Sequence, residues 1–353
     1  MTTRRLEVSR ARVLAYRQTA GSLVERLPRG ADSLRRAAWA GLQDSMPRAA
    51  LLSIHARVEG TEPTTWEDPA LVQLWGPRFS AFVVAAGDRG AFTLGRYPDA
   101  GHRRRIAQEM AEKVATLLDG RKMAYGEAGR ALGVNPNALR YAAPTGTILM
   151  RWDGARQPTI WSVPAPTIQP HEARLELARR YLHVFGPSTA EAFGDWAGIK
   201  PAGARAAFDA LARELAPVRT PIGDALLLAD DVPAIQAPTA QARRQGERPV
   251  VARLLPSGDA YTLHQNPAER TLLVADRALR DSLWTPRVWP GAILAGGELV
   301  GTWQRSQGEV TLRPWQRFTD PERDAIEAEA LSLPIPGVAG RISIAWDEAG
   351  QAP

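Results

Sequence analysis

The chain has 353 residues, of which 44% are hydrophobic and 23% are charged, a balance typical of a globular protein with two or three domains. This composition excludes a disordered, collagen-like or coiled-coil chain. Lysine and arginine outnumber aspartate and glutamate by 44 to 38, so the net charge is +6 and the expected partner is a polyanion such as nucleic acid.

Other residue counts exclude several kinds of site. With no cysteine, the chain cannot form a disulfide framework or use a thiol nucleophile. Its five histidines are scattered, so we expect no metal site. No glycine-rich phosphate loop or GxSxG elbow occurs, and we expect no nucleotide cofactor. The positive charge has a second explanation, because an arginine- and alanine-rich composition also follows from a GC-rich genome.

The chain lacks the apolar segments that direct a protein to or through a membrane. No run of 18 apolar residues is present, and the N-terminal residues do not form a signal peptide. We therefore expect a soluble, cytoplasmic protein. No heptad pattern or apolar dimer stripe stands out, which favours a monomer.

The N-terminal part, residues 1–100, predicts three short helices and a strand. The helices are expected over residues 6–26, 31–43 and 46–58, and the strand over 78–85. This order of elements is repeated twice more along the chain.

The second repeat, residues 101–168, has the clearest pattern. Apolar residues at helical spacing between 103 and 120 predict a first helix, and two short helices follow around a turn at 134–136. Alternating residues on either side of Asp153-Gly154 predict a β-hairpin. Helix, turn, helix and hairpin together are typical of a winged helix.

The third repeat and the C-terminal part complete the predicted organisation. Residues 169–240 predict three helices and a strand pair, and Ser188 or Thr189 is expected to cap the second helix. The polar segment 236–248 predicts an exposed linker. In residues 249–353 we expect three strands broken by glycine turns and then a closing helix. The predicted fold is mainly α with small β-hairpins (α+β): tandem winged-helix domains plus a C-terminal β-rich part.

Several segments resemble the AlkZ/YcaQ family of bacterial DNA glycosylases, over nearly the whole chain. The most specific are RRYLHVFGPSTAEAFGDWAGI at 179–199, LLPSGDAYTLHQ at 254–265 and GAILAGGELVGTWQ at 291–304. The segment GLQDSMPRAALLSIHAR at 41–57 is similar to the family segment whose Gln-x-Gln or Gln-x-Asp pair holds the catalytic water. The resemblance implies tandem winged helices and places Gln43 and Ser45 at the two site positions.

The chain departs from the family pattern at two places. Ser45 stands where the family has glutamine or aspartate, and Asp44 stands where the family usually has an apolar residue. In the segment Arg78-Phe79-Ser80-Ala81-Phe82 the family's histidine is replaced by Phe82. These departures concern the catalytic arrangement rather than the fold.

Two backbone geometries remain open for the candidate catalytic residues Gln43, Asp44 and Ser45. In extended backbone Gln43 and Ser45 lie on one face and Asp44 points away. In a helix the three side chains diverge, and Asp44 could face the site as a base. A third interpretation makes Asp44 or Ser45 the cap of the helix that starts near Pro47.

Candidate DNA contacts come from polar and basic side chains, since most DNA affinity comes from phosphate contacts. The resemblance places Arg57, Arg78 and Ser80 near the site. Other candidates lie on the second unit's recognition helix and wing: Asn137, Arg140, Arg151 and Arg156. The basic run 103–105 is either a solvated face or a phosphate contact. Trp152, Trp161 and His55 are expected to serve mainly in packing.

The resemblance implies a monofunctional DNA glycosylase that hydrolyses the N-glycosidic bond of cationic alkylated purines in double-stranded DNA. Alkylation at N7 or N3 makes the base a good leaving group, so positioned water and stabilisation of the sugar cation suffice. We expect no metal, no cofactor and no membrane partner. The alternative is a non-catalytic winged-helix protein, a regulator or damage-binding factor, in which Ser45 and Phe82 mark lost chemistry. The lesion could be a monoadduct or a crosslink.

Overall fold

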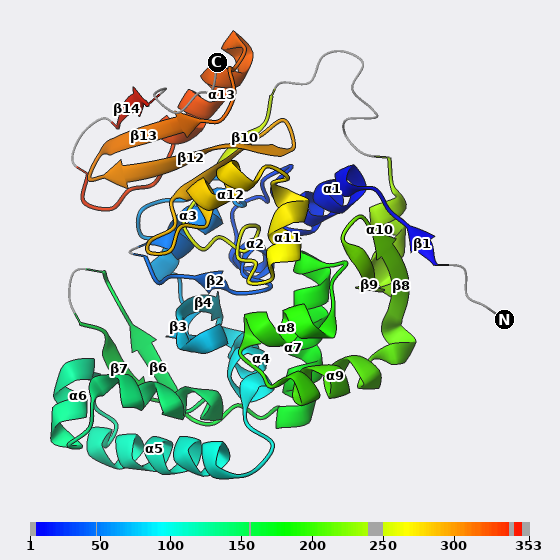
Figure 1. Ribbon diagram of the computed structural model, residues 1–353. Helices are drawn as coiled ribbons and strands as arrows, with labels where there is room; N and C mark the ends of the chain where they lie inside the picture. The colour runs from blue at the N-terminus through cyan, green and yellow to red at the C-terminus, as the bar shows by residue number, and fades with distance from the viewer. Residues whose placement is uncertain (1–4, 47, 155–156, 239–249, 339–341, 348–353) are drawn as a thin grey trace.

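The structure is a computed structural model that describes residues 5–46, 48–154, 157–238, 250–338 and 342–347. Helices and strands are mixed throughout, with several small sheets (Figure 1). No helix within these residues is long and apolar enough to cross a membrane. The predicted linker at 236–248 falls almost wholly outside the described residues.

The N-terminal part contains short helices around a three-stranded antiparallel sheet with strand order β2-β4-β3. Its elements are α1 (Arg10–Ala20), α2 (Ala31–Ala37), β2 (Leu42–Gln43), α3 (Ala49–His55), β3 (Leu71–Trp75), β4 (Ala81–Ala85) and α4 (Arg89–Thr93), with 3-10 turns at Thr65–Glu67, Pro77–Phe79, Ala86–Asp88 and Leu94–Arg96. The helix predicted to reach residue 43 is shorter, and β2 follows it. Gly41 makes this change of direction with φ +73, where a Cβ would lie 2.9 Å from the Phe92 ring.

The second part carries a hairpin on three helical segments. Its elements are α5 (His102–Leu118), β5 (Met123–Ala124), α6 (Tyr125–Ala131), a 3-10 segment (Pro136–Thr145), β6 (Ile148–Arg151) and β7 (Thr159–Ser162). The strands pair antiparallel in the order β5-β7-β6, and the hairpin predicted at Asp153-Gly154 is confirmed. The predicted third helix is 3-10 rather than α. It carries Pro136 in its first turn and Pro144 inside, and Pro144 cannot donate a helical hydrogen bond.

The third part has helices and a small sheet, as predicted. Its elements are α7 (Pro170–Phe185), α8 (Ala190–Ala197), α9 (Pro201–Ala210), β8 (Leu215–Thr220), β9 (Gly223–Leu228) and α10 (Val232–Gln236), with 3-10 turns at Ala212–Glu214 and Ala229–Asp231. Thr189 caps α8 by accepting a bond from the Ala192 amide. The strand β1 (Leu6–Glu7), at the N-terminal end of the described chain, joins this sheet parallel to β8. Residues predicted to belong to the first unit therefore contribute to the third.

The C-terminal part is a five-stranded sheet in the order β10-β11-β12-β13-β14. Its elements are β10 (Ala252–Leu255), α11 (Pro267–Leu273), α12 (Arg277–Leu283), β11 (Gly291–Ala295), β12 (Glu298–Ser306), β13 (Glu309–Pro314), α13 (Asp320–Leu331) and β14 (Ser343–Trp346). The three strands predicted between glycine turns are β11, β12 and β13. The predicted helix α13 does not end the fold, because β14 follows it and pairs parallel with β13.

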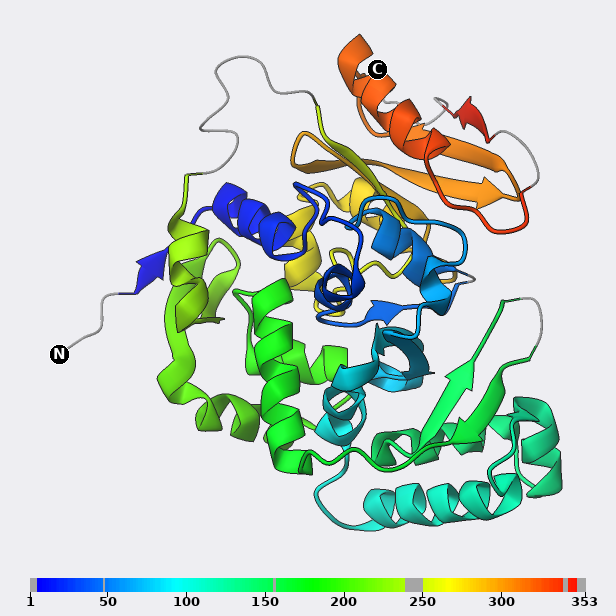
Figure 2. The same ribbon diagram turned by 180° about the vertical axis from the view of Figure 1, so that it is seen from behind.

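The parts are arranged so that two hairpins project on the same side. Figures 1 and 2 show the β6–β7 hairpin and the β12–β13 hairpin on that side, with β2, β3 and β4 between them.

A buried ion pair connects three parts of the chain. Arg17 on α1 is 1% exposed and donates to Glu269 on α11 at 2.6 Å. The Arg17 guanidinium also donates to the carbonyls of Gly186 and Pro187, and Glu269 accepts a bond from Ser188. Burial raises the pKa of Glu269, but Arg17 and the hydrogen bonds outweigh it and the net shift is downward. The turn after α7 is thus fixed to α1 in the N-terminal part and to α11 in the C-terminal part.

Removing the cation of this pair should destabilise the fold strongly. Arg17→Ala leaves the Glu269 carboxylate buried without its partner, and we expect a loss of about 3–5 kcal/mol in the free energy of unfolding. Urea denaturation measures this loss. The matched control is Arg29→Ala, which breaks an exposed pair with Glu62 and should cause no measurable loss. Equal effects of the two substitutions would contradict the interpretation.

Candidate active site and DNA interface

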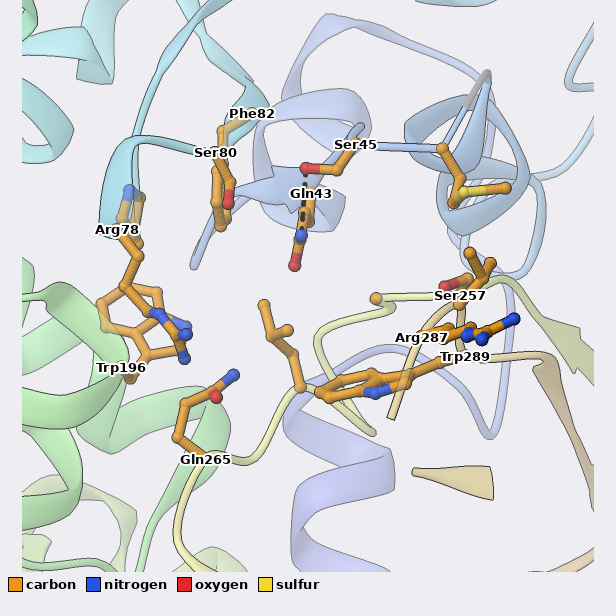
Figure 3. Close-up of a pocket in the computed structure, with 15 residues that line it drawn as sticks. Gln43, Ser45, Arg78, Ser80, Phe82, Trp196, Ser257, Gln265, Arg287 and Trp289 are labelled. Atoms are coloured by element: carbon orange, nitrogen blue, oxygen red, sulfur yellow. Dashed lines mark hydrogen bonds between the residues drawn. The ribbon is translucent and has the colours of Figure 1, made fainter. Parts of the chain in front are cut away.

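Gln43 and Ser45 lie side by side at the end of β2. Gln43 pairs with Phe82 of β4 in extended backbone, which sends the side chains of residues 43 and 45 to the same side. The carboxamide nitrogen of Gln43 donates to the Ser45 hydroxyl at 3.0 Å (Figure 3). The extended geometry is therefore the one present, and it leaves the Gln43 carbonyl oxygen available for another donor.

Asp44 points into the protein instead. Its side chain is 1% exposed and accepts bonds from the Ala50 amide at 3.0 Å and from the Gln73 carboxamide at 2.6 Å. The Ala50 amide belongs to the first turn of α3, although Arg48 occupies the N-cap position. Burial raises the pKa of Asp44 to about 7. Asp44 does not line the pocket described below, so its role would be to fix the segment that carries Gln43 and Ser45.

A hydrogen-bonded link connects Asp44 to the β6–β7 hairpin. The Gln73 carbonyl oxygen accepts a bond from the Trp152 amide, while its nitrogen donates to Asp44. Arg48, which begins α3, donates to the carbonyls of Trp152 and Asp153 at 3.0 and 2.7 Å. The hairpin is thus anchored to the segment that carries the candidate catalytic residues.

Gln43 and Ser45 open into a pocket of about 300 Å³ between the central sheet and the C-terminal part. The described residues that line it are Gln43, Ser45, Met46, Pro77, Arg78, Ser80, Phe82, Trp196, Ser257, Gly258, Leu263, Gln265, Arg287, Val288 and Trp289. None of them is acidic. The polar groups facing the candidate catalytic pair are neutral, apart from two guanidinium groups.

The two arginines lie on different sides of the pocket. Figure 3 shows Arg78 on one side and Arg287 on the other, with Gln43 between them. Arg78 has φ +55 and follows Pro77, and Arg287 lies in the loop between α12 and β11. Both side chains are exposed, and within the described part of the chain neither forms an ion pair. Two exposed guanidinium groups at one pocket suit an anion such as a phosphate.

A second, larger cavity adjoins the first. It measures about 870 Å³ and shares Ser45 and Ser80 with the pocket around Gln43. Aromatic side chains line much of it, from the sheet, the second part and the hairpin: Trp75, Phe79, Tyr125 and Trp152. The candidate pair therefore lies where a small pocket with no acidic lining residue among those described meets a broad aromatic cavity.

Three predicted DNA contacts lie around this second cavity. Arg140 lines it and donates to the Tyr125 hydroxyl at 3.1 Å, and that hydroxyl donates to the Asn137 side chain. Arg151 instead lies 4.0 Å from the centre of the Trp66 ring and pairs with Glu67 at 3.2 Å. Asn137 is exposed and Arg140 is half-buried, whereas the Arg151 side chain is 42% exposed with its charge paired to Glu67.

The structure corrects the placement expected for Arg57. Its side chain is 2% exposed and makes two hydrogen bonds to Asp259, of 2.7 and 2.8 Å. Arg57 lies in the interior rather than on a surface that DNA could touch, because Asp259 is buried and provides its counter-charge. His55 is also buried, with its Nε2 3.0 Å from the Ser332 hydroxyl.

The remaining candidates are less informative. Arg103 and Arg105 are exposed, and Arg104 donates to the Asp99 carbonyl. Trp161 packs partly against the core beneath Lys122. Arg156 lies outside the described residues. Among those the structure describes, no cluster of three histidine or acidic side chains could hold a metal ion.

The sequence did not predict the side of the pocket that the C-terminal part forms. Ser257 and Gln265 belong to the segment LLPSGDAYTLHQ, which indicated the family but no site. Arg287 and Trp289 carry no local signal at all, because their position depends on how the C-terminal part docks. Val288 beside them is 57% exposed, although it is apolar.

Comparisons with known proteins give a consistent result. A family model described as "DNA glycosylase AlkZ-like" matches residues 36–333. Among solved structures, the Streptomyces sahachiroi DNA glycosylase AlkZ matches with a TM-score of 0.76 and 19% sequence identity, over 97% of this chain and 100% of that chain. At that identity the likeness describes the fold alone. Comparison with curated protein sequences gave no match.

The pH dependence of stability tests the buried position of Asp44. Because burial raises its pKa from 3.8 to about 7, the folded protein holds this proton more tightly than the unfolded chain does. As the pH rises from 4 to 7, the free energy of unfolding of the wild-type protein should therefore fall relative to that of Asp44→Asn, by up to about 1.4 kcal/mol per pH unit. Above pH 7 the difference should stay constant. Urea unfolding of both proteins across this range measures it, and a difference independent of pH would argue against a buried carboxylate.

Proposed function

The chain belongs to the AlkZ-like DNA glycosylase family, and we propose that it excises cationic alkylated purines from duplex DNA as a monofunctional glycosylase. The observation that carries this proposal is the hydrogen-bonded pair Gln43–Ser45 in a pocket whose described lining residues include no acid. N7 or N3 adducts and crosslinks share the property that such a pocket requires, a positive charge on the base before the bond breaks. The resemblance of the sequence to this family is thus confirmed, while the substrate and site are proposals.

The proposed chemistry needs one water molecule. The side-chain carbonyl oxygen of Gln43 accepts a hydrogen bond from the water, and the Ser45 hydroxyl provides the second contact. The water oxygen bonds to C1′ of the sugar as the C1′–N bond breaks. That bond's electron pair goes to the purine, which leaves neutral, and the proton lost by the water passes to solvent. The product is an abasic site in an intact strand.

The absence of an acid among the described lining residues decides which bases this site can release. A neutral base must be protonated before it leaves, which requires a general acid. A purine alkylated at N7 or N3 already carries that positive charge. Neutral dipoles that orient water and stabilise the sugar cation are then sufficient. The pocket therefore suits cationic lesions and should not process undamaged purines.

Contacts with the DNA backbone would come from both sides of the pocket. Arg78 and Arg287 would bind phosphates near the lesion, with Ser80 beside Gln43 as a further hydrogen-bonding group. We propose that the second part acts as a winged helix, with Asn137 and Arg140 facing DNA, and that the repeated units and C-terminal part are arranged around the duplex. The protein would act as a monomer on nucleoid DNA in the cytoplasm, without a cofactor.

Excision should depend on Gln43. Gln43→Ala removes the side-chain carbonyl oxygen that accepts from the water, and a single-turnover excision rate about 100-fold lower is expected. The assay forms N7-methylguanine in duplex DNA and detects abasic sites by alkaline cleavage. Gln108→Ala, at an exposed position on α5, is the matched control and should keep the wild-type rate. Duplex binding without excision by the wild-type protein would favour the non-catalytic alternative.

Binding should depend on Arg287 more than on an arginine outside the pocket. Arg287→Ala removes one phosphate contact, so affinity should fall and the slope of log K against log salt should decrease by about 1. The control is Arg277→Ala, which removes the same charge from α12 at an exposed pair with Asp281. Fluorescence anisotropy with labelled duplex at several salt concentrations gives both quantities. Identical effects of the two substitutions would show that net charge alone controls binding.

A further inference from the structure

The loop between β10 and α11 lines the same pocket as the Gln43 side chain and approaches it closely. Gly258 in this loop has φ +76 and lies opposite the Gln43 side chain in the pocket. A Cβ at residue 258 would lie 3.1 Å from the Gln43 carbonyl oxygen and 3.2 Å from its carbon Cδ. These separations are shorter than ordinary van der Waals contacts. Any side chain at this position would therefore push the carboxamide away from its observed place.

The loop has little freedom to move aside, because its next residue is fixed in the interior. The Asp259 side chain is fully buried and accepts two hydrogen bonds from Arg57, one from Ser53 at 2.6 Å and one from the Tyr261 amide at 2.9 Å. Arg57 and the hydrogen bonds hold the pKa of Asp259 below its usual range, although burial alone raises it. The carboxylate is therefore charged and fully bonded at neutral pH.

The same helix supports both sides of the Gln43 carboxamide. Ser53 belongs to α3, and Arg57 follows directly after that helix. The first turn of α3 also binds Asp44, the neighbour of Gln43. On one side the Gln43 carboxamide donates a hydrogen bond to Ser45. On the other side it lies next to the position that a side chain at residue 258 would occupy. One short helix thus fixes the distance between the two contacts.

We propose that Gly258 is a positioning residue, whose lack of a side chain leaves the Gln43 carboxamide in the orientation that binds Ser45 and the attacking water. This proposal rests on the proposed function for its effect on catalysis, but the contact itself does not. It gives the segment LLPSGDAYTLHQ a role in the site. It also assigns Arg57 a role in positioning, in place of a direct contact with DNA.

The test compares two glycines that both have left-handed backbone. Gly258→Ala introduces a Cβ against Gln43, whereas Gly296→Ala, at φ +60 in the β11–β12 turn, introduces one with nothing within 4 Å. Both substitutions carry the same kind of backbone strain. Thermal unfolding shows that each variant is folded at the assay temperature, and duplex affinity should change equally in the two variants. Single-turnover excision of N7-methylguanine should fall by about 10- to 100-fold in Gly258→Ala and remain at the wild-type rate in Gly296→Ala.

A crystal structure of each variant gives a second readout that does not depend on activity. In Gly258→Ala the Gln43 carboxamide should be displaced from its wild-type position, and in Gly296→Ala it should keep that position. A Gly258→Ala protein whose carboxamide is not displaced, or that excises at the wild-type rate, overturns the proposal. If wild-type protein shows no excision, the proposed function fails, and the position of the carboxamide in the two crystal structures alone decides the role of Gly258.

Discussion

The buried ion pair between Arg57 and Asp259 is the interaction on which the arrangement of the site depends. The residues are 202 positions apart. Their hydrogen bonds of 2.7 and 2.8 Å join the segment that follows α3 to the loop between β10 and α11. An unpaired buried charge costs several kcal/mol, so neither part can move away from the other without that penalty. The pocket therefore has two walls at a fixed separation, although its residues come from the N-terminal, third and C-terminal parts of the chain.

The direction of Asp44 determines the chemistry that this pocket can support. Two-residue periodicity places Gln43 and Ser45 toward the pocket and turns the intervening carboxylate inward, where Ala50 and Gln73 bind it. A carboxylate in the pocket would stabilise the sugar cation more strongly, whereas neutral dipoles give less stabilisation and require a better leaving group. The inward carboxylate instead links the site to the β6–β7 hairpin through Gln73. Contact of that hairpin with DNA would thus act on the segment that carries Gln43.

Local sequence signals predicted the elements correctly where short-range chemistry determines them. The hairpin at Asp153-Gly154, the strands between glycine turns in the C-terminal part, and the Thr189 cap are of this kind. For residues 43–45 the sequence left extended and helical backbone open, and the pairing of Gln43 with Phe82 in the structure shows the extended one. The pairing of Arg57 with Asp259, the addition of β1 to the third sheet and the position of Arg287 could not be predicted, because each depends on contacts between distant segments. Arg57 was expected to contact DNA because it is basic and the resemblance places it near the site. It lies in the interior instead, because its partner Asp259 is buried.

In the proposed mechanism water attacks the sugar without a covalent enzyme intermediate, and trapping with borohydride tests this most directly. Excision of N7-methylguanine should give an intact strand that carries an abasic site, detected by mass spectrometry before any alkali is added. Borohydride added during the reaction should trap no protein–DNA adduct, because no amine forms a Schiff base in this mechanism. A trapped adduct, a strand broken at the lesion or an alkylated duplex left unchanged would contradict the account.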